Sequence, residues 1–370
     1  MEKVVQEIPE KTAQQGSDKA RNRKLARFGI IFGILGLILF AYFVRKAGVT
    51  QILEGIKRLG FGFLLVLAIS STRHMVRALA WTKCFEAPYS LKFRHALEAR
   101  LMGDAVGNIV PLASAAVSEP SKAAFVTNRV PLLASLSAIA LENIFYSMSV
   151  VLFIFSGTTA LLLTVSLPKG LHYASIAALV ITVGIVPLGY LVLRKRVKFL
   201  SGAMSFLFGR GIARAWMEKG LPGARALEDR IYSFYEGNGN KCIAIFLLEL
   251  CFHAAGVTEI YVTLWFISDL VAPTLLTAFI LESVNRVIVV VFKFMPFRLG
   301  IDEAGTGKIS EVLGFSDNIG VTLAIVRKGR DLFWTAVGMG LIVRRGFSLK
   351  KLGKVNDEAA LAGGSVKPGA

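Results

Sequence analysis

The stretch FGFLLVLAISSTRHMVRALAW, residues 61–81, decides the fold class, because this long apolar run also carries two arginines. About 20 mostly apolar residues cross the roughly 30 Å hydrocarbon core of a bilayer as a helix. Arg73 and Arg77 are four residues apart and Trp81 follows one turn later, so the three side chains share a helix face. The run therefore predicts a transmembrane helix with one charged face.

The two arginines make this helix marginal on its own. Two arginines near the centre of a span cost about 5 to 7 kcal/mol on an insertion scale. The nine Phe, Leu, Ile and Val residues of the run return only about 3 to 5 kcal/mol. We therefore expect the charged face to be buried against other helices or a hydrated cavity. The alternative is that both arginines, which lie toward the last third of the run, snorkel to the cytoplasmic headgroups.

The rest of the chain has the same character. Of its 370 residues, 54% are apolar and 18% charged, whereas soluble domains are about 45 to 50% apolar. Six more apolar runs are candidate spans, at residues 28–44, 131–155, 172–193, 241–267, 274–294 and 321–343. The sequence thus predicts an all-α, polytopic transmembrane helix bundle of about seven to eight spans.

The basic residues indicate how this bundle is oriented. The formal net charge is +18, but most basic residues flank apolar runs, as the positive-inside rule expects, so we do not expect nucleic-acid binding. We predict a membrane domain over residues 28–345, with a cytoplasmic amphipathic loop at 194–240. The tails at 1–27 and 346–370 are polar, and we expect them to be cytoplasmic and disordered.

Seven crossings contradict this orientation. Starting from a cytoplasmic N-terminus, an odd number would place the basic residues Arg344 and Arg345 outside. One solution is an eighth crossing at residues 158–167. The other is that the segments 101–126 and 295–314 enter the membrane without forming ordinary spans, since irregular backbone is tolerated there when protein or a water-filled cavity receives it.

The two irregular segments resemble each other in their order of residues. The first, GDAVGNIVPLASAAVSEPSKAAFV, places Pro111 before Glu119, and the second, MPFRLGIDEAGTGKISEVLG, places Pro296 and Gly300 before Glu303. In each we expect a structural break, followed by an acidic residue at the start of a short helix, where the helix dipole favours it. One segment lies in each half, which suggests an internal repeat with paired broken helices. Ordinary loops with helix caps are the alternative.

Ionisable residues also occur inside other predicted spans. Intramembrane charges are costly and usually face the interior, so they suggest a polar cavity or a headgroup site. Structural salt bridges are the alternative, and Glu282 and Arg286 have the spacing of such a pair. The candidate headgroup-binding residues are Arg73, Arg77, Glu119, Glu142, Glu282, Arg286, Glu303, Arg327 and Arg330.

Metal and cofactor sites are not indicated. Glu249 and His253 have the i,i+4 spacing of a metal pair, but no third ligand accompanies them, so a hydrogen bond is the better interpretation. The three cysteines lack CxxC spacing. No nucleotide-binding loop or hydrolase elbow is present in the sequence. We therefore expect no cofactor, no metal and no ATP hydrolysis by the chain itself.

The sequence resembles the lysylphosphatidylglycerol synthase transmembrane region, also called the flippase-like family, over residues 28–345. The resemblance rests on the charged face of residues 73–81, on PLASAAVSEPSKAAF (111–125), on Glu142, and on PFRLGIDEAG (296–305) and VRKGRDLFW (326–334). Two positions depart from the family pattern. Ser118 precedes Glu119 where a Gly is common, and Asn143 follows Glu142 where an Arg is common.

This resemblance implies a function in lipid transport. The best-understood members move a cationic aminoacyl lipid between leaflets, and others accompany hopanoid or isoprenoid-linked sugar pathways. The implied ligands are anionic or aminoacylated phospholipids or polyprenyl-linked lipids, and a homodimer or pathway enzymes are possible partners. After residue 343 only about 27 residues remain, so we expect the aminoacyl-transferase domain of two-part members to be absent and the protein not to be an enzyme.

We therefore predict a lipid translocase, or a lipid-binding transport protein, of the bacterial inner membrane. Two alternatives remain open. The first is a scaffold that holds soluble enzymes of a lipid pathway through the 194–240 loop and the tails. The second is a membrane-embedded lipid transferase or hydrolase that uses Glu119 or Glu303 as a general base.

Overall fold

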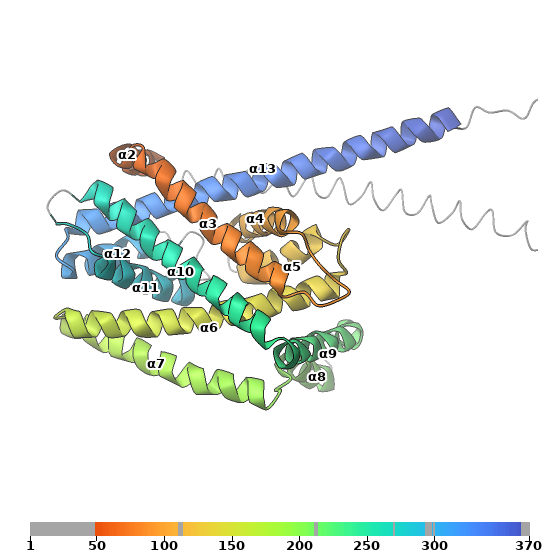
Figure 1. Cartoon of the computed structure of the whole chain (residues 1–370), viewed down its shortest axis with the longest axis horizontal. Coiled ribbons are helices and arrows are strands. Elements are labelled where there is room, and N and C mark those ends of the chain that lie inside the picture. The colour runs from red at the N-terminus through yellow and green to blue at the C-terminus, as the bar shows by residue number, and fades with distance from the viewer. Residues whose placement is uncertain are drawn as a thin grey trace, which may run out of the picture.

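The fold is all-helical, as the sequence predicts (Figure 1). The computed structural model describes residues 49–109, 114–210, 214–268, 271–292, 298 and 300–363. Within these residues there are twelve helices and no strand. They are α2 (Val49–Leu59), α3 (Gly62–Lys83), α4 (Phe93–Ile109), α5 (Ser114–Phe125), α6 (Leu132–Thr164), α7 (Lys169–Arg194), α8 (Phe199–Gly209), α9 (Arg214–Gly237), α10 (Gly239–Ile267), α11 (Leu275–Val291), α12 (Ile301–Val312) and α13 (Asp317–Gly363).

Six of these helices occupy predicted spans. They are α3, α6, α7, α10, α11 and α13. Three of them, α3, α6 and α10, are both long enough and apolar enough to cross a membrane by length and composition. This confirms a helical membrane bundle. The predicted first span, residues 28–44, lies outside the described residues.

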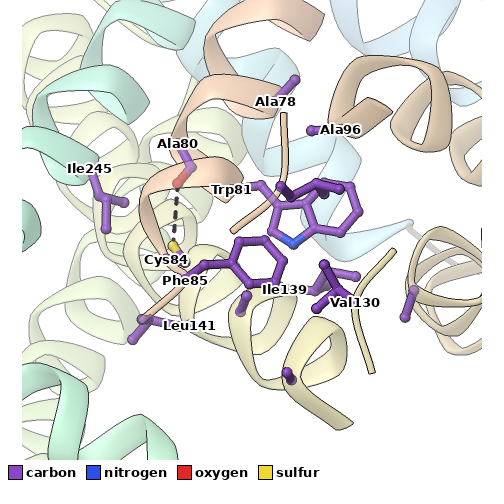
Figure 2. Packing of buried hydrophobic residues seen from close by; sticks show 14 of the residues in the cluster. Ala78, Ala80, Trp81, Cys84, Phe85, Ala96, Val130, Ile139, Leu141 and Ile245 are labelled. Atoms are coloured by element: carbon purple, nitrogen blue, oxygen red, sulfur yellow. Dashed lines mark hydrogen bonds between the residues drawn. The ribbon is translucent and has the colours of Figure 1, made fainter. Parts of the chain in front are cut away.

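One end of the bundle is held together by a first apolar cluster. It joins the end of α3, the start of α4, the end of α5 and the starts of α6 and α10. In Figure 2, Trp81 near the end of α3 and Phe85 just after this helix lie beside Val130 and Ile139. The Cys84 thiol donates to the carbonyl oxygen of Ala80 at 3.3 Å.

A second apolar cluster holds the opposite end together. It contains Leu161 at the end of α6, Leu264 at the end of α10 and Ala278 near the start of α11. It also contains Ile309 near the end of α12 and Leu323 near the start of α13. The two clusters therefore contain opposite ends of the same long helices.

These clusters show that the chain forms two helical hairpins of opposite direction. The pair α4–α5 begins and ends in the first cluster, and the pair α11–α12 begins and ends in the second. The hairpins also match in size, because α4 and α11 have 17 residues each and α5 and α12 have 12 each. Two matching hairpins of inverted direction are the arrangement expected of an inverted internal repeat.

The helix packing follows the same inverted symmetry. Helix α3 packs along α10, α4 packs on α13, and α11 packs on α6. Small residues allow close approach at both of the latter contacts. A Cβ added at Gly157 of α6 would overlap Ser283 of α11, and one added at Gly338 of α13 would overlap the backbone of Leu101 in α4.

The structure corrects three expectations. Residues 158–164 form no crossing of their own, because they continue α6 to Thr164. Glu119 does not begin a helix, because α5 starts at Ser114. Helix α13 continues to Gly363, so the expectation of disorder from residue 346 is wrong up to that residue.

The break residues are described only in part. Pro111 and Pro296 lie outside the described residues. Gly300 precedes α12 with a φ of 84°, a left-handed conformation that glycine adopts without steric cost. Its N–H donates to Glu303 at 2.9 Å, so Glu303 does occupy the first turn of a short helix, as predicted.

Most of residues 194–240, predicted to be an amphipathic loop, lies in the paired helices α8 and α9. The Glu228 carboxylate of α9 accepts hydrogen bonds from the Leu200 N–H at 2.6 Å and the Ser201 hydroxyl at 2.5 Å, at the first turn of α8. Phe234 of α9 joins the first apolar cluster. The α8–α9 pair therefore lies at the same end of the bundle as the opening of the α4–α5 hairpin (Figure 1).

Candidate functional site

A polar cavity of about 220 Å³ lies between the two hairpins. Its walls come from α3, α4, α10, α11, α12 and α13, together with Arg298 just before α12. The charged residues of its lining are Arg73, Arg77, Arg100, Arg286, Arg298, Arg327, Arg330, Asp104, Asp302 and Asp331, and His74 accompanies them.

Helix α3 turns its charged face into this cavity. Arg73 and Arg77 are 7% and 9% exposed, so the interior-facing interpretation is confirmed and the snorkelling alternative is wrong. Spacing of four residues on one helix places both guanidinium groups on the same wall. Trp81, one turn further, is 1% exposed and packs in the first apolar cluster instead.

Arg77 is held by a bidentate pair with Glu142 of α6. Its Nε and Nη2 donate to the two carboxylate oxygens at 2.7 and 2.8 Å. Nη2 also donates to Asn143 at 3.2 Å, and the guanidinium lies 3.8 Å from the centre of the Tyr146 ring. Arg100 of α4 donates to the same Glu142 carboxylate at 3.2 Å. Glu142, which is 1% exposed, thereby links α3, α4 and α6.

Arg73 connects two further carboxylates. Its Nη1 lies 3.2 Å from Glu259 of α10 and its Nη2 lies 3.4 Å from Glu282 of α11. Glu282 also accepts from Arg286 Nε at 2.9 Å, which confirms the pair predicted within this helix. Arg330 of α13 donates to Glu259 as well. These contacts join α3, α10, α11 and α13 around the cavity.

The wall formed by α12 and α13 has its own ion pairs. Arg298 lies 3.3 Å from Asp302 and 3.8 Å from Asp331. Arg330 pairs with the adjacent Asp331 at 2.7 Å. Arg327 instead donates to the hydroxyl of Thr306 on α12.

Glu119 and Glu303 lie outside the cavity lining, and each holds a buried lysine. The Lys122 ammonium lies 3.0 Å from Glu119 and 2.8 Å from Asp104 of α4. Lys328 of α13 pairs with Glu303. Both lysines are 2% exposed. Each hairpin therefore has one glutamate paired with a buried lysine, which comes from the same helix for Glu119 and from α13 for Glu303.

The charges are arranged in two layers. Seven arginines but only three aspartates line the cavity. The other balancing carboxylates belong to Glu142, Glu249, Glu259 and Glu282, which are outside the lining. A group inside the cavity is therefore surrounded mainly by guanidinium N–H donors, which favour a negatively charged oxygen.

Comparison with known families gives one match over most of the chain. The sequence profile of the lysylphosphatidylglycerol synthase transmembrane region matches residues 25–338. The chain belongs to this family. Among curated proteins and solved structures, no match to the chain is found. Membership in the lysylphosphatidylglycerol synthase transmembrane family identifies a membrane protein of lipid metabolism or transport.

For this family member, sequence reasoning found only part of the site. It identified the five lining arginines that lie in predicted spans. It missed residues of the irregular segments and their surroundings, and also two charged residues inside predicted spans, Glu259 and Lys328. The missed residues with contacts in the network are Arg100, Asp104, Lys122, Glu259, Arg298, Asp302 and Lys328. The rule used for intramembrane charges would have found Glu259, because it interrupts an apolar run.

Glu249 and His253 have separate partners. The Glu249 carboxylate lies 3.5 Å from Arg77 Nε. His253 lies 3.1 Å from the Ser149 hydroxyl and stacks on Phe153. Within the described residues, no group of three His, Cys, Asp or Glu side chains is arranged to hold a metal ion.

Proposed function

We propose that this protein is a lipid translocase, or a lipid-binding transport protein, that moves the charged headgroup of an envelope lipid through the cavity between the hairpins. The observation that carries this proposal is the lining of seven arginines inside a membrane bundle. Such charges are expensive in a bilayer and are typical of a substrate or ion pathway. Structural pairing alone would require only that each arginine be neutralised, and would not require a polar cavity.

The ligand class follows from the lining. Guanidinium groups donate paired, charge-assisted hydrogen bonds to phosphate oxygens. Anionic phospholipids, aminoacylated phospholipids and polyprenyl-linked lipids all offer such a phosphate, while their acyl or prenyl tails remain in the surrounding hydrocarbon. A polar path through protein removes part of the dehydration cost that a charged headgroup meets in the bilayer core.

The two inverted hairpins support a transport role. In transporters with inverted repeats, the substrate site lies where the repeats meet, and movement of one repeat against the other exposes it alternately to each side. Here both hairpins contribute to the cavity, through Arg100 and Asp104 of α4 and through Arg286 and Asp302 of α11–α12. A lipid gradient or the membrane potential, about 2.3 kcal/mol per charge per 100 mV, would supply direction without ATP hydrolysis.

The test is leaflet exchange of fluorescent lipids in liposomes that contain the purified protein. Phosphatidylglycerol, lysyl-phosphatidylglycerol and a polyprenyl-phosphate sugar are compared. We expect exchange of one lipid class, and at least a tenfold loss of its rate in Arg298→Gln, because Arg298 is a partly exposed lining residue. The matched control is Arg94→Gln, because the Arg94 side chain is 79% exposed and outside the lining.

Two results would contradict this proposal. The first is exchange no faster than in empty liposomes for all three lipids, with folded protein present. The second is equal exchange rates in wild type and in Arg298→Gln. The first result would favour the scaffold hypothesis, in which deletion of α8–α9 rather than a cavity substitution abolishes function.

A further inference from the structure

Arg327 differs from the other arginines of the cavity. Each of the other six lies within 3.3 Å of a carboxylate oxygen. Arg327 is 4% exposed and donates through Nη2 to the uncharged hydroxyl of Thr306. Its Nε and Nη1 are buried and have no hydrogen-bond partner among the described residues. Arg327 is therefore the one lining arginine whose charge no described carboxylate compensates at contact distance.

This arrangement is unfavourable for a residue with a purely structural role. A buried charge is tolerated in proteins when it is paired and its hydrogen-bond donors are satisfied. The fold meets this condition at the six other arginines, including Arg77, which has a bidentate partner. A buried polar group without a partner requires an explanation, and for a charged side chain that lines a cavity a ligand of opposite charge provides one.

We infer that Arg327 binds the phosphate of the transported headgroup, a single phosphodiester with one negative charge. This inference rests on the proposed function and names its ligand chemistry. A phosphodiester supplies the missing negative charge and two non-bridging oxygens, which accept hydrogen bonds from the free N–H groups of Nε and Nη1. Asn285 and Arg298 also line this cavity, so a polar amide and a second guanidinium are available to the rest of the headgroup.

The inference separates two kinds of arginine by their effect on stability. Replacing a paired arginine leaves a buried carboxylate without its cation, which destabilises the fold. Replacing Arg327 removes an uncompensated buried charge, and methionine retains much of the side-chain volume. We therefore expect ligand-free Arg327→Met to be at least as stable as wild type, whereas Arg77→Met loses stability because Glu142 and Glu249 both lose a cation.

The experiment measures thermal unfolding of the full chain in detergent micelles, with and without added ligand. The probes are short-chain phosphatidylglycerol, short-chain phosphatidylcholine and inorganic phosphate. We expect phosphatidylglycerol to raise the Tm of wild type in a concentration-dependent way and to bind Arg327→Met roughly tenfold or more weakly. Arg327→Lys should bind with intermediate affinity, because it keeps the charge but loses the forked donor geometry.

The outcomes distinguish the ligand sources and the two proposals. A Tm increase with inorganic phosphate but not with the lipid would overturn the assignment to a headgroup. So would equal binding of phosphatidylglycerol by wild type and Arg327→Met, or a loss of ligand-free stability in Arg327→Met as large as that in Arg77→Met. If Arg327 is required for lipid binding but liposomes show no exchange, the phosphate site stands and translocation fails. If exchange occurs and Arg327→Met leaves it unchanged, translocation stands and this site fails.

Discussion

At the scale of single residues, the core of the protein contains charged side chains, and most of them form ion pairs with each other. Glu142 shows how closely the pairs depend on one another, because one carboxylate accepts hydrogen bonds from Arg77 at 2.7 and 2.8 Å and from Arg100 at 3.2 Å. Removing one member of such a buried pair is costly, since the other charge remains without a partner. We therefore expect the network to contribute to the stability of the fold as well as to the proposed lipid site.

Glu142→Gln tests this dependence. The amide keeps the shape of the side chain but removes the charge that Arg77 and Arg100 share, so we expect a loss of about 3 to 5 kcal/mol of stability. Thermal or denaturant unfolding in detergent measures it. In the double variant Glu142→Gln, Arg77→Met, the loss should be smaller than the sum of the two single losses, because the residues interact directly. Additive losses would show that the pair carries no coupling energy.

At the scale of helices, close approach of backbones determines where the carboxylates lie. Gly256 of α10 faces Glu282 of α11, and an added Cβ would lie 2.6 Å from its Oε1. Glu282 in turn contacts Arg73 and Arg286. The glycine therefore provides the space in which one carboxylate reaches two arginines from different helices.

Gly256→Ala should displace Glu282 and weaken both of its ion pairs. We expect a loss of about 1 to 3 kcal/mol from overpacking, together with slower lipid exchange if the cavity transports lipid. The matched control is Gly184→Ala in α7, where no atom lies within 4 Å of the added Cβ. Alanine has the higher helix propensity, so the control should be neutral or slightly stabilising. A stable Gly256→Ala variant would contradict the packing argument.

The contact between α8 and α9 depends on the carboxylate of Glu228. Glu228 is 6% exposed and accepts hydrogen bonds from the backbone N–H of Leu200 and from Ser201. We expect Glu228→Ala to lose about 1 to 3 kcal/mol locally, because buried N–H groups at the start of α8 lose their acceptor. Limited proteolysis between α8 and α9 should then become faster. Glu236→Ala, which removes only an exposed pair with Arg196, serves as the control and should behave as wild type.

At the scale of the whole molecule, the direction of the two hairpins leads us to propose a number of membrane crossings. Because α11–α12 begins and ends in the second apolar cluster, it contributes no net crossing. The same holds for α4–α5 and the first cluster. We propose that five of the described helices cross the membrane, namely α3, α6, α7, α10 and α13. With the predicted span at residues 28–44 the proposed total is six, fewer than the seven to eight predicted, and an even number is what two cytoplasmic termini require.

This proposed count predicts which connections are accessible from each side of the membrane. With Cys84, Cys242 and Cys251 replaced by serine, a single cysteine at Lys198, beside α8, should react with a membrane-impermeant maleimide only after the cells are permeabilised. A single cysteine at Lys169, at the start of α7, should react in intact cells. Reaction of both cysteines in intact cells, or the reverse pattern, would contradict the proposed orientation.

The sequence by itself determined the fold class, the positions of six described helices and the family. These conclusions depend on apolar runs and on short motifs such as PFRLGIDEAG, which are local properties of the chain. It also predicted that Arg73 and Arg77 face the interior, because two arginines on one face are too costly in lipid.

Only the tertiary structure decided how the broken segments are arranged and which charges meet. Arg73 pairs with Glu259 and Glu282, which are 186 and 209 residues away in the chain, and no local pattern specifies such contacts. Hydropathy identified residues 274–294 as a span but could not show that α11 returns through α12 to the same end. The exception at Arg327 likewise appears only when the partners of all seven lining arginines are known, because a missing counter-charge is a property of the assembled cavity.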